Sequence, residues 1–117
     1  MGNAYDVLGD TGKAAEAWRS VVRIAPKNVE ALYKLGRLEM DRAQLKTALD
    51  YLRKAAVDVP EDRAWAADVF FQLGYAELQS GSKKNARDAL AKYLTLAPTD
   101  APDRPVVEKQ LERLAGN

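Results

Sequence analysis

Apolar residues recur at helical spacing in two long stretches of the chain. In the segment 29–40 they are Ala31, Leu32, Leu35 and Leu38, and in the segment 45–59 they include Leu45, Ala48, Leu49, Leu52 and Ala55. Steps of three and four residues place these side chains on one face of an α-helix. No stretch shows the alternation of apolar and polar residues, rich in β-branched types, that is typical of a strand. The pattern therefore predicts an all-α protein.

Two unrelated landmarks repeat along the chain with the same pair of intervals. The glycines Gly2, Gly36 and Gly74 are 34 and 38 residues apart, and so are the prolines Pro26, Pro60 and Pro98. This agreement indicates one structural unit present three times, with four residues inserted in the third copy between Pro60 and Gly74. Each unit is predicted to be a helix, a turn and a second helix, which the proline ends because it cannot continue the hydrogen-bond ladder.

Glycine recurs in the middle of predicted helices, where it costs about 1 kcal/mol relative to alanine. A costly residue that recurs indicates a packing requirement, so we expect the partner helix to approach closely at these glycines. The facing residues are expected to be the alanines Ala14, Ala48 and Ala86. Large residues at a second common position, Trp18, Leu52 and Leu90, would fill the remaining space.

These residues resemble the tetratricopeptide repeat, a 34-residue helix–turn–helix unit that stacks into a right-handed superhelix. The second copy carries the pattern at Leu32, Leu35, Gly36, Ala48, Leu52, Ala55 and Pro60. The third carries it at Phe70, Leu73, Gly74, Ala86, Leu90 and Pro98, and the first at Met1, Gly2, Tyr5, Ala14, Trp18 and Pro26. The chain departs from the pattern at Glu39 and Glu77, where a large residue is usual and looser packing is expected, and at Ala43, which replaces the turn glycine. The resemblance implies a right-handed α-solenoid of three repeats.

The expected boundaries follow from the repeat. Repeat one covers 1–28 and lacks its first turn, repeat two covers 29–62, and repeat three covers 63–100. A capping helix is expected over 101–117. It has an apolar stripe on one face, and its opposite, charged face would shield the last repeat from water. Since the first helix would have only two turns, we expect the chain to be the C-terminal piece of a longer protein, or to have that end covered by a partner. The alternative is a short native helix.

The resemblance also implies a function and a surface. In this family the first helix of each repeat lines a concave groove, which binds an extended or helical segment of another protein. Carried over residue by residue, the groove positions are Asn3, Tyr33, Lys34, Arg37, Met40, Phe71, Gln72, Tyr75 and Leu78. The large apolar members are expected to be exposed as anchors for the partner, the alternative being that they pack between neighbouring helices.

Trp65 lies in the inserted segment of repeat three. We expect it to pack against the second helix of the preceding repeat and to account for a lengthened helix. A position at the rim of the groove is the alternative.

One subtype of the family holds the acidic C-terminus of heat-shock chaperones with a clamp of lysine, asparagine and arginine side chains. Asn3 matches one clamp position, but the others hold Lys34, Asp68 and Gln72. An aspartate at a position that should bind a carboxylate would repel it. We therefore do not expect binding to chaperone tails.

Composition limits the remaining chemistry. The 117 residues include neither Cys nor His, so thiolate chemistry, the commonest general base and the commonest metal ligands are missing. There is also no phosphate-binding loop. We expect no metal, no cofactor and no catalysis, and therefore a protein-interaction scaffold. The second possibility is a self-assembly module that stacks through the open N-terminal end or the terminal helix.

Charge and hydropathy give no sign of other partners. The net charge of +1 offers no global argument for nucleic acid or an anionic membrane, and no apolar run approaches the length of a membrane span. The basic pairs Arg53–Lys54 and Lys83–Lys84 have acids nearby and are expected to be solvated helix faces. The compartment is not indicated. A cytoplasmic location is favoured, and a periplasmic one stays open if a leader was removed.

Overall fold

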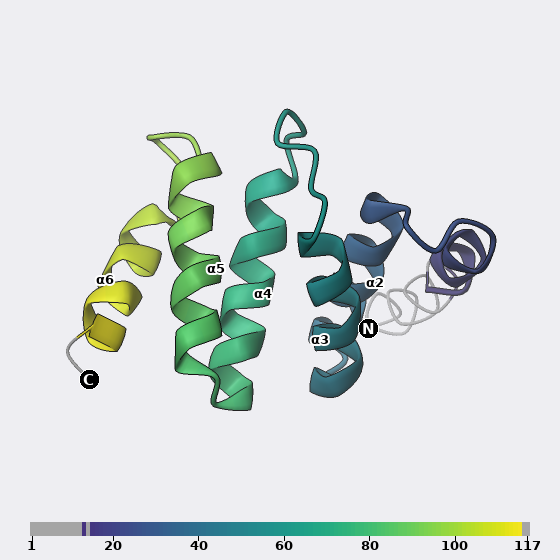
Figure 1. The fold of residues 1–117 in the computed structure, drawn as a ribbon, viewed down its shortest axis with the longest axis horizontal. Coiled ribbons are helices and arrows are strands. Elements are labelled where there is room, and N and C mark those ends of the chain that lie inside the picture. Colours follow the sequence, from purple (N-terminus) through teal and green to yellow (C-terminus); the bar gives the residue numbers. More distant parts are fainter. Residues whose placement is uncertain (1–12, 14, 116–117) are drawn as a thin grey trace, which may run out of the picture.

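Antiparallel helix pairs follow one another along the chain (Figure 1). This is a computed structural model, which describes residue 13 and residues 15–115. Residues 15–24 are helical, and the following helices are α2 (Val29–Asp41), α3 (Leu45–Ala56), α4 (Ala66–Ser80), α5 (Lys83–Leu96) and α6 (Arg104–Ala115). No strand occurs among the described residues. Helix α2 packs on α3, α3 on α4, α4 on α5 and α5 on α6, so the fold is the expected all-α solenoid.

The two mid-helix glycines lie where helices approach closely. A Cβ atom on Gly36 would lie 2.6 Å from Cγ of Leu52, and one on Gly74 would lie 2.5 Å from Cδ2 of Leu90. The predicted close approach is therefore confirmed at Gly36 and Gly74, whereas Gly2 and Ala14 lie outside the described residues. The side chain nearest to each glycine is, however, the leucine of the second helix rather than the expected alanine.

The turns within repeats two and three use the same left-handed backbone position. Gly81 has a φ of +91° and ends α4, and Ala43, in the same register, has a φ of +59° between α2 and α3. Glycine adopts this conformation without strain, whereas the Cβ of alanine meets a neighbouring carbonyl oxygen. The turn forms even though Ala43 replaces the usual glycine.

The insertion in repeat three lengthens a loop more than a helix. Val29 begins α2 three residues after Pro26, whereas Ala66 begins α4 six residues after Pro60. Three of the four additional residues are thus in the loop and one is in α4. Helix α4 has 15 residues against 13 in α2, so the expected lengthening of the helix is present, but it accounts for the smaller part of the insertion.

Helix α6 closes the described array in the way its apolar stripe predicted. Val107 and Leu114 are buried in the same apolar cluster as residues of α4 and α5. The guanidinium of Arg104 donates 2.9 Å hydrogen bonds to the carbonyl oxygens of Leu94 and Ala97. Since the last carbonyls of a helix have no partner within it, Arg104 both caps α5 and holds α6 against it.

Candidate partner-binding groove

Tyr33 is buried, contrary to the expectation that it lies open in the groove. Its side chain is 2% exposed, and its hydroxyl donates a hydrogen bond to the carboxylate of Asp68 in α4. Burial and the neighbouring Asp68 raise the pKa of Tyr33 to about 12. The expectation was wrong because residues of the next repeat cover the ring.

Trp65 is the residue that covers Tyr33. The two rings stack with centroids 5.4 Å apart and planes 10° apart. Its aromatic partner is therefore in α2, the first helix of the preceding repeat, whereas we expected the second. Half-buried beside this core position, Trp65 ties the inserted loop to α2.

Two cationic side chains, Arg37 and Lys34, lie beside the buried phenol of Tyr33. The guanidinium of Arg37 donates a 3.3 Å hydrogen bond to the Tyr33 hydroxyl and lies 4.0 Å from the carboxylate of Asp68. The ammonium of Lys34 is 5.6 Å from the centre of the Tyr33 ring, within the range of a cation–π contact. The Arg37 side chain is still 51% exposed, so it is positioned by the protein and also accessible to a ligand.

A cavity of about 260 Å³ lies next to these cations. It is lined by Trp18, Lys34, Arg37, Leu38 and Asp41, and we call it the Trp18 cavity. Sequence reasoning placed Trp18 in the core, because it shares its register with Leu52 and Leu90. It is in fact half-buried, and it lines the cavity together with Lys34 and Arg37.

The apolar strip expected on α4 mostly completes the core. Phe71, Tyr75 and Leu78 are half-buried against the cluster that includes Val107 and Leu114 of α6. The ring of Phe71 lies 4.9 Å from that of Tyr75 and 5.6 Å from that of Tyr93 in α5. The structure therefore favours packing between neighbouring helices over a fully open strip.

The Tyr75 hydroxyl is buried and has no hydrogen-bond partner among the described residues. Burial is the main cause that raises the pKa of Tyr75, and Asp103 at the start of α6 raises it further. The hydroxyl is thus enclosed close to the α6 end of the array.

The other expected groove residues divide between the surface and the core. Met40 is half-buried and packs against a second apolar cluster, which contains Leu49, Leu52 and Leu73. Gln72 is half-buried on α4. Asn3 lies outside the described residues.

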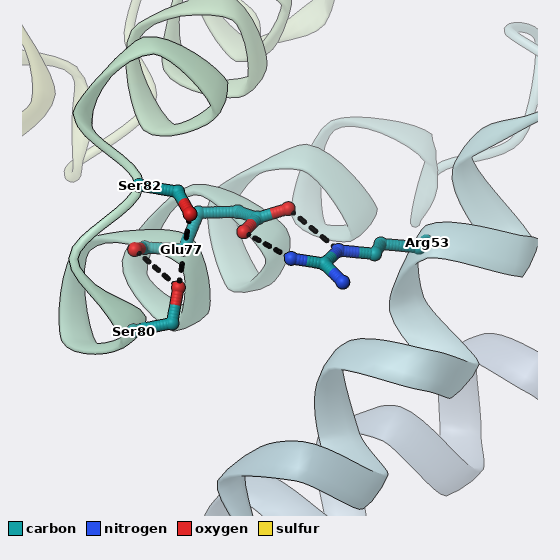
Figure 2. Close-up of polar contacts among 4 residues, drawn as sticks. All are labelled: Arg53, Glu77, Ser80 and Ser82. Carbon is teal, nitrogen blue, oxygen red and sulfur yellow. Dashed lines mark hydrogen bonds and ion pairs between the residues drawn. The ribbon is translucent and has the colours of Figure 1, made fainter.

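Buried carboxylates connect consecutive repeats, and sequence reasoning missed their role. Glu77 is 3% exposed and accepts two hydrogen bonds from Arg53 of α3, at 2.9 and 2.7 Å (Figure 2). Glu39, in the same register of repeat two, accepts a 3.1 Å hydrogen bond from Arg42 and lies 4.0 Å from Arg19 of repeat one. These buried acids are accommodated because each has an arginine partner. The sequence signal for this pairing was that Arg19 and Arg53 occupy the same position in consecutive repeats.

The described part of the chain offers no evident place for a metal or a membrane span. No group of three or more acidic, histidine or cysteine side chains among these residues could hold a metal ion. No helix among them is both long and apolar enough to cross a bilayer.

The stacked helix pairs define an α-solenoid. A family model described as tetratricopeptide repeat matches residues 1–64, and a second of the same description matches residues 67–100. The chain therefore belongs to the tetratricopeptide repeat family, whose fold serves as a scaffold for protein–protein interaction.

Solved structures agree with this assignment. The chain is similar to a structure described as the crystal structure of MamA protein, with a TM-score of 0.74 and 27% identity over 99% of this chain and 59% of that one. A second MamA crystal structure gives a TM-score of 0.71 and 27% identity over 98% of this chain and 67% of that one. The chain thus spans between half and two thirds of the length of these structures. No curated protein sequence matches it significantly.

Proposed function

We propose that the chain is a non-catalytic scaffold that binds a segment of a partner protein at the Trp18 cavity and along the adjoining surface of α2 and α4. The cavity itself carries the proposal, because an aromatic ring lies there beside two accessible cations. An apolar side chain of the partner would occupy the side lined by Trp18 and Leu38. A carboxylate near it in the partner would reach Lys34 or Arg37.

The arrangement around Arg37 supports binding with a small entropic cost. Tyr33 and Asp68 already hold the guanidinium, so little side-chain freedom remains to be lost when a ligand arrives. Tryptophan and arginine are also the residue types that contribute most at protein interfaces. The accompanying Asp41 would disfavour ligands that carry a second carboxylate at that edge.

A displayed library of random peptides tests this proposal. The library is selected on the wild-type chain, and the selected peptides are then measured against the double variant Lys34→Ala/Arg37→Ala. We expect enrichment of peptides with an acidic residue close to a large apolar one, and a loss of affinity of about tenfold or more in the variant. Tyr33 is not a suitable target, because its removal would open the core.

The matched control removes two exposed cations away from the cavity, in the variant Arg63→Ala/Lys109→Ala. It carries the same change of net charge and should bind the selected peptides as the wild type does. Equal binding by both variants and the wild type would show that the peptides use another surface.

Self-assembly is a second candidate, favoured by apolar residues that the described surface leaves exposed. Ile24, Val57 and Val106 are 85%, 84% and 55% exposed. Val57 also lines a cavity of about 440 Å³ together with Pro26, Lys27, Val29, Leu32, Lys54 and Asp58. We propose that Val106 on α6 contacts this region of a second copy.

Light scattering across a range of protein concentrations tests self-assembly. If the mass rises with concentration for the wild type and not for Val106→Asp, the terminal helix takes part in the contact. A mass that stays monomeric at every concentration would reject this candidate and leave the peptide-binding proposal untouched.

A further inference from the structure

Charges are separated between the two long edges of the solenoid, although the net charge of the chain is only +1. Helices α3 and α5 both begin at the edge that is lower in Figure 1, and the loops 57–65 and 97–103 lie at the upper edge. The upper loops contain Asp58, Glu61, Asp62, Asp100 and Asp103 against Arg63, and the loop 25–28 that leads into α2 at the same edge adds Lys27. The lower edge, residues 41–47 and 79–88, contains Arg42, Lys46, Lys83, Lys84 and Arg87, against Asp41 and Asp88.

Most of the cations on the lower edge have no acidic partner. Arg42 pairs with Glu39, but no ion pair to Lys46, Lys83, Lys84 or Arg87 is present among the described residues. All four side chains belong to exposed residues. The expectation that acids balance the Lys83–Lys84 pair is therefore not met by any contact, because Asp88 does not reach Lys84. We call these four residues the cationic edge.

The cationic edge costs the fold stability. Lys83 and Lys84 are the first two residues of α5, where the helix dipole is positive and disfavours further positive charge. Lys83 and Arg87 are four residues apart, so they are adjacent like charges on one helix face. An acidic residue in the first turn would relieve this repulsion, but the first turns of both α3 and α5 lack one. A ligand that supplies negative charge would relieve it.

The surroundings of the cationic edge fit a flat polyanion better than a peptide. Among the described residues, the exposed large apolar side chains are Ile24, Val57 and Val106, and none of them belongs to residues 41–47 or 79–88. None of the four residues of the cationic edge lines the Trp18 cavity or the cavity beside Val57, although Asp41 of the lower edge lines the former. Aromatic side chains, which would stack on the bases of a single-stranded nucleic acid, are absent from residues 41–47 and 79–88.

We propose that the cationic edge binds the surface of an anionic lipid bilayer. Clusters of about four to eight lysine and arginine residues attract anionic headgroups, and each adds to the affinity. Because the opposite edge is acidic, contact would orient the molecule with its lower edge toward the lipid. None of the four cationic residues lines the Trp18 cavity, so this proposal goes beyond partner binding and does not depend on it.

Vesicle sedimentation tests the proposal directly. We expect the wild-type chain to sediment with vesicles that contain phosphatidylserine and to stay in solution with vesicles of phosphatidylcholine alone. The variant Lys83→Glu/Lys84→Glu should bind the anionic vesicles about tenfold or more weakly. Because glutamate is favourable at a helix N-terminus, this variant should be at least as stable as the wild type. A loss of binding will then not be attributable to unfolding.

The matched control is Lys27→Glu/Lys109→Glu, which changes the net charge equally at exposed positions away from the cationic edge. It should retain most of the vesicle binding. Absence of binding by the wild type, or equal losses in both variants, would overturn the proposal. Tighter binding to duplex DNA than to anionic vesicles at equal phosphate concentration would also overturn it, because the polyanion would then be nucleic acid. The variant Lys34→Ala/Arg37→Ala should bind vesicles normally, which separates this surface from the Trp18 cavity.

Discussion

The guanidinium of Arg53 and the buried carboxylate of Glu77 form two hydrogen bonds, of 2.9 and 2.7 Å, across the junction of repeats two and three. The carboxylate is 3% exposed, so water cannot replace the arginine fully if it is removed. We predict that Arg53→Ala lowers the free energy of unfolding by about 2 kcal/mol, because a buried charge loses its partner. Urea denaturation followed by circular dichroism measures this.

The exposed pair of Lys54 and Asp50, at 3.1 Å in α3, is the control for the Arg53 variant. Lys54→Ala should cost less than about 0.5 kcal/mol, as surface ion pairs within a helix usually do. Replacing both Arg53 and Glu77 by leucine should restore most of the stability. Similar losses for Arg53→Ala and Lys54→Ala would contradict the role of burial.

Exchanging alanine and glycine at positions 43 and 81 should change the stability of the protein in opposite directions. Both residues have positive φ, and a Cβ on Gly81 would meet no atom within 4 Å, so the effect is purely one of backbone conformation. We expect Ala43→Gly to raise the free energy of unfolding by about 1 kcal/mol and Gly81→Ala to lower it by a similar amount. Thermal unfolding of the two variants measures both signs. A loss of stability in Ala43→Gly would mean that the methyl group makes a contact worth more than the strain.

Alanine at Gly74 should destabilise the protein although alanine favours helices. The new methyl group would lie 2.5 Å from Leu90, a fully buried side chain that has little room to move. We predict a loss of about 1–3 kcal/mol, as for other cases of overpacking. The double variant Gly74→Ala/Leu90→Ala checks the cause, because the smaller residue removes the clash. Its loss of stability should be clearly less than the sum of the two single losses.

Tyr33 should make the protein sensitive to high pH. Its pKa is raised to about 12, so the folded state favours the neutral phenol. This contribution is fully present below about pH 10, the ordinary pKa of tyrosine, and is lost as the pH rises through 12. Absorbance near the phenolate band should show a tyrosine that titrates near pH 12. In Tyr33→Phe this step should vanish, and an unchanged titration would assign the high pKa to Tyr75 or Tyr93.

Much of the fold was predictable because repetition multiplies weak signals. One glycine in a helix indicates little, but Gly36 and Gly74 at matching distances from Pro60 and Pro98 located both helix pairs. Helical periodicity likewise placed Leu52 and Leu90 in the core, where the structure has them. These features depend on contacts within one repeat, so they recur in each copy and the copies reinforce one another.

The candidate site was less predictable because it depends on contacts between repeats. Tyr33 occupies a groove position within its own helix, but Trp65 and Asp68 of the next repeat stack on its ring and bind its hydroxyl. Trp18 shows the converse effect. Its register predicted the core, yet its neighbours leave the indole partly accessible beside Lys34. Neither the burial of Tyr33 nor the partial exposure of Trp18 can be predicted from the periodicity of a single helix.

The pairing of an arginine in one repeat with an acid in the next determines where an additional repeat could be inserted into the chain. Arg19 and Arg53 occupy the same register of their repeats, and the corresponding residue of repeat three is Ala91. An additional copy of repeat two, spliced in front of repeat three, would bring both its own arginine and its own glutamate to matching partners. In a copy joined after α5, the glutamate would face Ala91 and lack an arginine partner. Extension of the protein at that junction would therefore first require Ala91→Arg, whereas insertion before repeat three would not.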